Sequence, residues 1–337
     1  MASSLLAPRL GIWLLLVGLT GCLAASLMVG RYPVSPLTAL GILFGQTSDC
    51  PPEMTTVLMK IRLPRILAAL EVGAALAASG SAYQGMFRNP LVSPDILGVS
   101  AGAGFGAALG ILLSWNAFAV QASAFLFGLL AVGLTSLIGL WRGGREDSTL
   151  VMILAGVIIG TMFSAFISLI KFSADPNNTL PAITFWLMGS LASVSMSDVT
   201  LAGVPILVGL GGLLLLRWRL NLLCFGDEEA ISLGVNVPLM RLLVILCATL
   251  ATASAVAISG IVGLVGLVAP YLTRLLVGPD HRVMVPCAIL LGGGYLLLVD
   301  DLARSLLPSE VPLGILTSLL GAPVFLLLLV KAQRSWS

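Results

Sequence analysis

The sequence predicts an all-α polytopic membrane protein in which residues 1–337 form a single transmembrane domain. Two observations lead to this prediction. Hydrophobic residues make up 58% of the chain and charged residues only 9%, whereas charged residues are near a quarter of an ordinary soluble domain. The apolar residues also fall into runs of about 20, the length that crosses a bilayer as a helix.

Ten such runs follow one another, separated by shorter polar segments. We expect transmembrane helices near residues 10–30, 64–86, 93–114, 117–141, 149–170, 197–217, 239–259, 266–278, 284–306 and 312–331. The eighth run is short, so its helix should begin within the glycine-rich segment 258–266. An even number of spans places both termini on the same side of the membrane.

The first run contains a segment, residues 19–22, that resembles a lipoprotein processing box. The apolar residues continue to Val29, which is long enough for a retained span. We therefore interpret the run as the first transmembrane helix. Of the connecting segments, 31–60 and 171–196 are long enough to hold local structure, and Phe185 and Trp186 favour a helix at headgroup depth in the second.

Small residues recur at every fourth position in two of the expected helices. They are Gly98, Gly102, Gly106 and Gly110 in the third helix, and Gly156, Gly160, Ser164 and Ser168 in the fifth. This spacing lets a second helix approach closely, and for the third helix we favour packing. The stripe of the fifth changes from glycine to serine hydroxyls, so packing and the lining of a transport pathway both stay open.

The distribution of lysine and arginine favours cytoplasmic termini, because cytoplasmic loops carry the excess of these residues. This orientation places Arg9, Arg88, Arg142, Arg145, Arg217, Arg219, Arg241, Arg274, Arg282, Lys331 and Arg334 inside. It leaves Arg31, Lys60, Arg62, Arg65, Lys171 and Arg304 outside.

A hydrophilic island at residues 224–237 then lies in the cytoplasm, between the sixth and seventh helices. It contains three consecutive acids, Asp227, Glu228 and Glu229, each of which would cost a few kcal/mol in the hydrocarbon. Apolar Ile231 and Leu233 and a glycine stop predict a short surface helix with an exposed apolar side. Such a helix is suited to contact a partner.

The sequence shows no catalytic signature and no metal-ligand set. The single histidine, His281, has no second histidine for a zinc-protease pair, and there is no phosphate-binding loop. The five cysteines lack a paired metal spacing. A net charge of +2 does not indicate a nucleic-acid partner. We expect a protein that is not an enzyme and binds no cofactor.

Charged residues at the outer ends of helices are the remaining candidates. Arg62 and Arg65 lie one turn apart, so their guanidiniums can point outward together as a carboxylate-binding pair; snorkelling at the interface is the alternative. Arg304 follows Asp300 and Asp301 by one turn. Three outer arginines favour docking of an acidic soluble partner.

Glu71 lies about two turns into the second helix, where an unpaired carboxylate is costly. It either faces the transport pathway or pairs with a polar group on a neighbouring helix. We favour the structural role.

Several long motifs resemble the FecCD-type permeases of iron-siderophore, haem and cobalamin importers. They are RLPR at 62–65, GSAYQGMFRNPLVSPDILGVSAGA at 80–103, LGVN at 233–236, GIVGLVGLVAP at 260–270, PLGILT at 312–317 and GAPVF at 321–325. The resemblance covers about residues 60 to 330. It departs at Tyr271, where the family commonly has histidine, and at Leu264, where an aromatic residue is common. Both departures put the transfer of substrate identity in doubt.

The resemblance implies the fold of a type II ATP-binding-cassette (ABC) importer permease, with ten helices per subunit and the pathway at the axis of a homodimer in a bacterial inner membrane. Its implied partners are two cytoplasmic ATPase subunits, which bind ATP and Mg²⁺, and a periplasmic binding protein. The coupling segment, about 220–240, maps onto Gly226, Asp227, Glu228, Glu229, Ala230, Leu233 and Gly234. The docking residues map onto Arg62, Arg65 and Arg304.

We therefore expect ATP-driven alternating access that imports a metal chelate, such as a ferric siderophore, haem or cobalamin. A molybdate-like oxyanion is the alternative cargo. The alternative mechanism is an ion-coupled secondary transporter or channel without a motor subunit, which would need acidic or histidine pairs deep in the spans.

Overall fold

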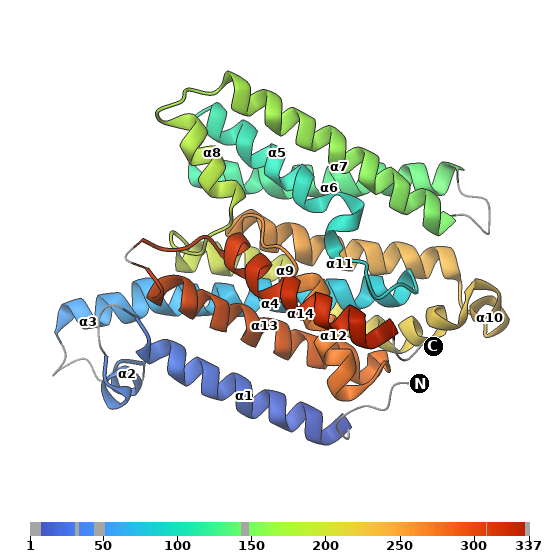
Figure 1. Cartoon of the computed structure of the whole chain (residues 1–337), viewed down its shortest axis with the longest axis horizontal. Helices are drawn as coiled ribbons and strands as arrows, with labels where there is room; N and C mark the ends of the chain where they lie inside the picture. Colours follow the sequence, from blue (N-terminus) through green and yellow to red (C-terminus); the bar gives the residue numbers. More distant parts are fainter. Residues whose placement is uncertain (1–7, 31–33, 44–50, 143–147, 308, 334–337) are drawn as a thin grey trace.

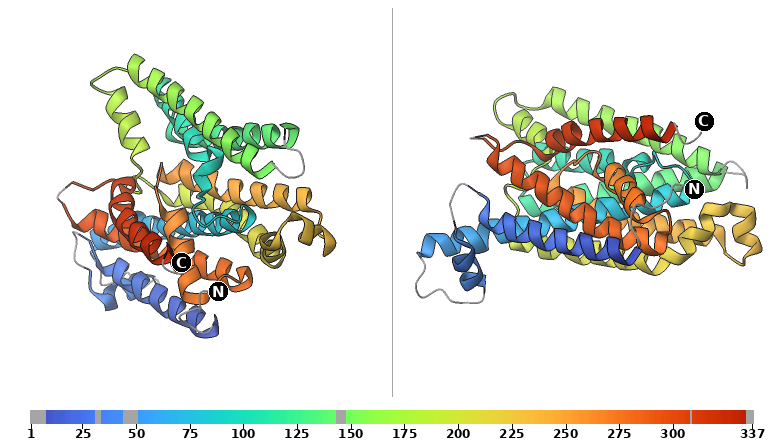
Figure 2. Two further views of the ribbon diagram at one scale, coloured as in Figure 1. Left: turned by 45° about the vertical axis from the view of Figure 1, so that its right-hand side comes forward. Right: turned by 60° about the horizontal axis from the view of Figure 1, so that its bottom comes forward.

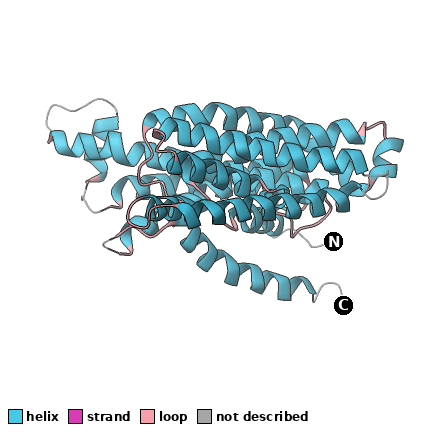
Figure 3. Ribbon diagram, turned by 90° about the horizontal axis from the view of Figure 1, so that it is seen from above, coloured by secondary structure: helices cyan, strands magenta, loops and turns pink. Residues whose placement is uncertain are grey.

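The computed structural model describes residues 8–30, 34–43, 51–142, 148–307 and 309–333. All regular secondary structure in these ranges is helical, as the colouring of Figure 3 shows. The predicted all-α class is confirmed.

Ten helices match the ten predicted runs. They are α1 (Pro8–Met28), α4 (Leu63–Met86), α5 (Val99–Leu112), α6 (Ala117–Arg142), α7 (Ser148–Ser173), α9 (Met196–Phe225), α11 (Val237–Ser259), α12 (Val265–Val277), α13 (His281–Ser305) and α14 (Leu313–Gln333). Seven helices of the described chain are long and apolar enough to cross a membrane. The shorter apolar helices are α5, α12 and the described part of α14.

Six shorter elements connect these helices. They are α2 (Pro36–Leu43), α3 (Pro52–Thr56), the π-helix η1 (Val57–Arg62), the 3₁₀ turn η2 (Pro94–Leu97), α8 (Thr179–Leu187) and α10 (Asp227–Ser232). α8 carries Phe185 and Trp186, so the predicted helix in this segment is confirmed. α10 confirms the short surface helix predicted within the hydrophilic island.

The prediction of one continuous helix over residues 93–114 is wrong. The chain forms η2, turns at Gly98 with φ of 83°, and only then enters α5. Fourteen residues of α-helix rise about 21 Å, which is less than the hydrocarbon thickness of about 30 Å. The segment therefore holds a broken element, and its irregular backbone is covered by α7 and by the hydroxyl of Thr135, which donates to the carbonyl of Leu97 at 3.1 Å.

Helix starts agree with the local sequence. Ser195 and Asp198 form a capping box at the start of α9, in which each side chain bonds the other residue's backbone N–H. Asn236 accepts from the N–H of Leu239 at the start of α11, and Asp280 accepts from that of Arg282 at the start of α13. These caps satisfy N–H groups that lack a partner inside the helix.

Helix α4 lies at the centre of the bundle, where α9, α11, α12 and α13 surround it. Its contacts with two neighbours are backbone to backbone. A Cβ atom on Gly73 would clash with the carbonyl of Gly292 in α13, and one on Gly80 would clash with that of Gly266 in α12. Small residues thus let helices touch where the bilayer supplies no hydrophobic drive.

A second layer, formed by α5, α6, α7 and α8, covers one side of this core (Figure 2). It joins the core mainly through contacts of α6 and α5 with α11. Figure 1 shows α2, α3 and α8 at one end of the bundle, and α10 at the other, together with the first turn of α1 and the last turn of α14. We call the first the arginine end, because Arg62, Arg65 and Arg304 lie there, and the second the α10 end.

Candidate functional site

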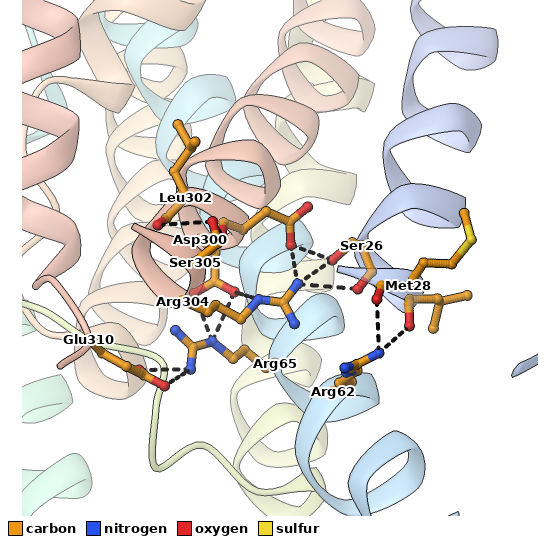
Figure 4. Close-up of polar contacts among 11 residues, drawn as sticks. Ser26, Met28, Arg62, Arg65, Asp300, Leu302, Arg304, Ser305 and Glu310 are labelled. Carbon is orange, nitrogen blue, oxygen red and sulfur yellow. Dashed lines mark hydrogen bonds and ion pairs between the residues drawn. The ribbon is translucent and has the colours of Figure 1, made fainter. Parts of the chain in front are cut away.

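Arg65 lies in the first turn of α4 and contacts two acids from distant parts of the chain (Figure 4). Its Nε donates to both carboxylate oxygens of Asp300 at 2.9 Å. Its Nη1 donates to the two oxygens of Glu310 at 2.9 and 2.8 Å. Asp300 is fully buried, whereas the side chain of Glu310 is 36% exposed. Arg65 thus has one buried acidic partner, Asp300, and one that solvent reaches, Glu310.

Arg304, in the last turn of α13, continues this network toward α1. Its Nη2 contacts the carboxylate of Asp301 and donates to the hydroxyl of Ser26 at 2.7 Å. The Ser26 hydroxyl donates to Asp301 at 2.7 Å. Arg62 bonds the same helix, because its Nη1 donates to the carbonyl of Leu27 at 2.6 Å. α1, α4 and α13 are therefore joined by charged hydrogen bonds at this end.

The structure brings the three predicted arginines together but does not expose them. Arg62, Arg65 and Arg304 are 3%, 4% and 7% exposed. The expectation that Arg62 and Arg65 point outward as a pair is not met here, since each guanidinium has partners on a different helix. Their docking role stays a prediction. Sequence reasoning missed Glu310, an acid in the loop before α14 that only the fold brings to Arg65.

At the other end, α10 presents an acidic and an apolar surface. Gly226 precedes it with φ of 125° and ψ of 162°, and Gly234 follows it with φ of 81°. Asp227 accepts from Nη2 of Arg241 at 2.9 Å, which fixes α10 to α11. Glu228, Glu229 and Gly234 are exposed.

Of the seven predicted coupling residues, two are buried (Gly226 and Ala230), one is partly exposed (Asp227) and four are exposed (Glu228, Glu229, Leu233 and Gly234). Ala230 is fully buried in the main core, so it holds α10 against the bundle and cannot contact a partner in this conformation. Ile231 and Leu233 are 57% and 62% exposed. These two side chains and the two glutamates form the outer surface of α10.

A groove of about 480 Å³ runs between η2, the start of α5, and α7. Three residues of the predicted stripe line it, namely Gly156, Gly160 and Ser164; the fourth, Ser168, lies further along α7 and is exposed. Gly156 also packs against the backbone of Ile96. The stripe therefore serves both packing and the groove.

The groove is weakly polar. Its lining includes hydroxyls of Ser100, Thr161 and Ser164, and the last two donate to carbonyls of their own helix at 2.8 Å. Asp95 is the only ionisable residue among those that line it, and it accepts from the hydroxyl of Ser100. The groove thus offers oxygen atoms and apolar surface but no fixed positive charge.

Glu71 does not line this groove. It lies on α4 beside Gly203 of α9, where the missing side chain leaves room for the carboxyl group: a Cβ there would lie 2.8 Å from Oε1. Its Oε2 is buried and has no hydrogen-bond partner within the described chain. The structure separates Glu71 from the stripe of α7.

Among the described residues, no group of three His, Cys, Asp or Glu side chains is placed to hold a metal ion. Four cysteines are free, and Cys50 falls outside the described ranges. His281 is buried at the start of α13, with Nδ1 3.1 Å from Oδ1 of Asn221.

Comparison with known proteins gives consistent results. The model of the FecCD transport family matches residues 15–331. The molybdate import system permease MolB of Haemophilus influenzae is 43% identical over 92% of each chain. The hemin transport system permease HmuU of Yersinia pestis is 37% identical over 98% of each. A solved metal-chelate type ABC transporter, titled as an inward-facing conformation, superposes with a TM-score of 0.86 at 42% identity, covering 96% of this chain and 99% of that one.

Proposed function

The chain belongs to the FecCD transport family, and from this premise we propose that it forms, with a second copy, the membrane pathway through which an ABC importer moves a metal-bearing solute into the cytoplasm. As a multi-pass permease it performs no chemistry on the solute. The observation that supports this role most directly is the groove beside α7, whose hydroxyl-bearing face is left open in the single chain.

The groove supplies half of the proposed pathway. Thr161 and Ser164 are exposed on α7 although the helix is long enough to span the membrane. A second copy facing this helix would close the groove into a passage. Because the lining lacks a basic side chain, it would hold a solute weakly, as passage requires.

Two variants on the same helix test this pathway. Ser164→Trp should fill the groove and reduce uptake by tenfold or more, whereas Ser168→Trp, also exposed on α7 but outside the groove, should leave most uptake intact. Both are measured in proteoliposomes that contain the assembled transporter. Equal losses in the two variants, or none in Ser164→Trp, would remove the groove from the pathway.

For the cargo we propose a metal chelate of the ferric siderophore, haem or cobalamin type. The absence of fixed positive charge in the groove lining supports a chelate over a small anion. The similarity to a molybdate permease favours an oxyanion as the second candidate. Uptake of radiolabelled ferric siderophore, haem, cobalamin and molybdate, measured side by side, separates the two.

Movement would be driven by two ATPase subunits seated against α10 on the cytoplasmic side. Ile231 and Leu233 provide the apolar contact, and Asp227 passes the displacement of α10 to α11 through Arg241. Glu228→Lys with Glu229→Lys should abolish ATPase co-purification or uncouple ATP hydrolysis from uptake. Because both glutamates are exposed, the fold should be unaffected. Normal uptake in this variant would exclude α10 as the coupling element.

At the opposite end we propose docking of a soluble binding protein through carboxylates. A partner carboxylate would replace the partly exposed Glu310 at Arg65, or add to it. Reversal of the buried arginines would strand Asp300 and Asp301, so Arg65→Lys is the better test: it keeps the charge beside Asp300 and loses the planar fork that also reaches Glu310. It should weaken docking of the partner that co-purifies by a similar factor at low and at high salt, because the charge is unchanged. Lys60→Gln, which removes an exposed cation nearby, is the control.

A motor-free secondary transporter remains the rival. Glu71 is its best candidate for ion coupling, since one oxygen of this carboxyl group has no hydrogen-bond partner in the described chain. Under the ABC mechanism, Glu71→Gln should leave ATP-driven uptake within about twofold of wild type. Uptake that needs no ATP and is lost in Glu71→Gln would establish the rival.

A further inference from the structure

A pocket of about 350 Å³ lies at the α10 end, between the last turns of α9 and the first turns of α11. Leu222, Leu239 and Leu243 form its apolar part. Arg219, Gly234 and Asn236 supply polar groups. It is separate from the groove beside α7 and from the docking arginines, and it shares Leu233 and Gly234 with the coupling segment.

The position of this pocket relative to the membrane follows from the length of α9. The helix has 30 residues and would rise about 45 Å, more than the hydrocarbon thickness of about 30 Å. Counted from Asp198 in the capping box, 20 residues of helix place Trp218 at the far boundary of the hydrocarbon. Tryptophan is enriched at this depth. Arg219 therefore lies among lipid headgroups, while Leu239 and Leu243, in the first two turns of α11, face acyl chains.

The charge around the pocket favours an anion. Arg217 and Arg219 are exposed, and neither forms an ion pair within the described residues. A third cation, Arg282, lies over the ring of Trp218 at 5.5 Å. Asp280, the acid two residues before Arg282, already accepts a hydrogen bond from the side chain of Asn221 at 2.6 Å.

The hydrogen-bonding groups fit a phosphate. Asn236 uses its Oδ1 to cap α11, where it accepts from the N–H of Leu239 at 3.1 Å. Its NH₂ group is left as a donor, and both Asn236 and Arg219 line the pocket. A guanidinium and an amide together match the oxygens of a phosphodiester, and basic pockets between transmembrane helices bind anionic headgroups.

We propose that this pocket binds one anionic phospholipid from the leaflet on the α10 side. The phosphate contacts Arg219 and Asn236, and an acyl chain lies along Leu239 and Leu243. The lipid would fill the space between α9 and α11 directly behind α10, so it supports the helix that we propose to contact the ATPase. The binding site itself does not depend on that proposal.

The test uses the purified full-length protein in detergent with added phosphatidylglycerol or phosphatidylcholine, and native mass spectrometry to count retained lipids. Wild type should retain phosphatidylglycerol preferentially. Arg219→Gln should lower this retention about fivefold, the effect of one basic residue at a membrane surface. Arg217→Gln removes the same charge two residues away, outside the pocket, and should change it less than twofold.

A second variant tests the apolar part without changing charge. Leu239→Trp should fill the pocket and lower retention of phosphatidylglycerol to a similar extent; the exposed position tolerates the larger ring. Equal retention of the two lipids by wild type would overturn the proposal, as would equal losses in Arg219→Gln and Arg217→Gln. Loss of ATPase co-purification in Arg219→Gln, with lipid retention intact, would show that a protein occupies the pocket instead.

Discussion

At the arginine end, Arg65 and Asp300 are buried against each other, while at the α10 end Glu228 and Glu229 are exposed and Asp227 shares a partly exposed pair with Arg241. The first arrangement joins helices, because a buried charge must keep its partner. The second leaves its charges free for contact with another molecule. Acidic and basic residues thus serve different purposes at the two ends.

The largest effect should come from breaking the buried network. Arg65→Met leaves Asp300 without its main partner in a fully buried position, which typically costs 3–5 kcal/mol. We expect the detergent-solubilised variant to unfold irreversibly at a clearly lower temperature than wild type. Arg65→Met combined with Asp300→Leu should recover part of the loss, because an apolar pair needs no desolvation. A double variant no better than the single one would contradict this account.

A smaller and more local effect is expected at the start of α10. The backbone of Gly226 has φ of 125° and ψ of 162°, a region in which other residues cost about 1–3 kcal/mol. Gly226→Ala should raise hydrogen exchange in α10 while leaving α4 unchanged. Gly234→Ala, where φ is 81° but no atom lies within 4 Å of an added Cβ, should have a weaker effect. Equal protection of α10 in Gly226→Ala and wild type would show that the cap does not hold the helix.

The two ion pairs can be compared directly by double-mutant cycles. For Asp227→Asn with Arg241→Gln we expect a coupling free energy of about 0.5–1 kcal/mol, because both side chains contact solvent. The Arg65–Asp300 cycle should give a value several times larger. Coupling energies of similar size at the two ends would remove the proposed difference in their roles.

The smallest effect concerns Asp280, which caps α13 at the α10 end. Partial burial opposes its ionisation, but hydrogen bonds from the Arg282 N–H and the Asn221 side chain lower the pKa of this carboxyl below its usual value. Ionised Asp280 therefore stabilises the fold above its unfolded-state pKa, and the contribution is lost as the pH falls through the lowered value. Asp280→Asn should be less stable by about 0.5 kcal/mol at pH 7. The difference should narrow as the pH falls below the unfolded-state pKa of this carboxyl.

The sequence was sufficient to predict most of the fold. Apolar runs locate seven long helices and three shorter apolar ones, and Gly234 marks the end of α10, because these signals are local. The break at Gly98 was missed, since the apolar pattern of residues 93–114 does not distinguish a 3₁₀ turn from the start of a helix.

The candidate site was less predictable, because its contacts are long range. Arg65 and Glu310 are 245 residues apart, and only the packing of α4 beside α13 brings them together. The burial of Ala230 depends likewise on how α10 folds back onto α9 and α11. Periodicity within one helix carries no information about either contact.

The glycine contacts of α4 have a consequence for how this protein tolerates change. Where Gly73 and Gly80 touch neighbouring backbones, there are no side chains whose rotamers could adjust to a substitution. In a library of variants selected for uptake, these positions should accept almost nothing but glycine, while the exposed surface of α10 should vary until the partner changes. Sequence variation at the centre of the molecule would then be limited by helix packing, and variation at its ends would be limited by the partners.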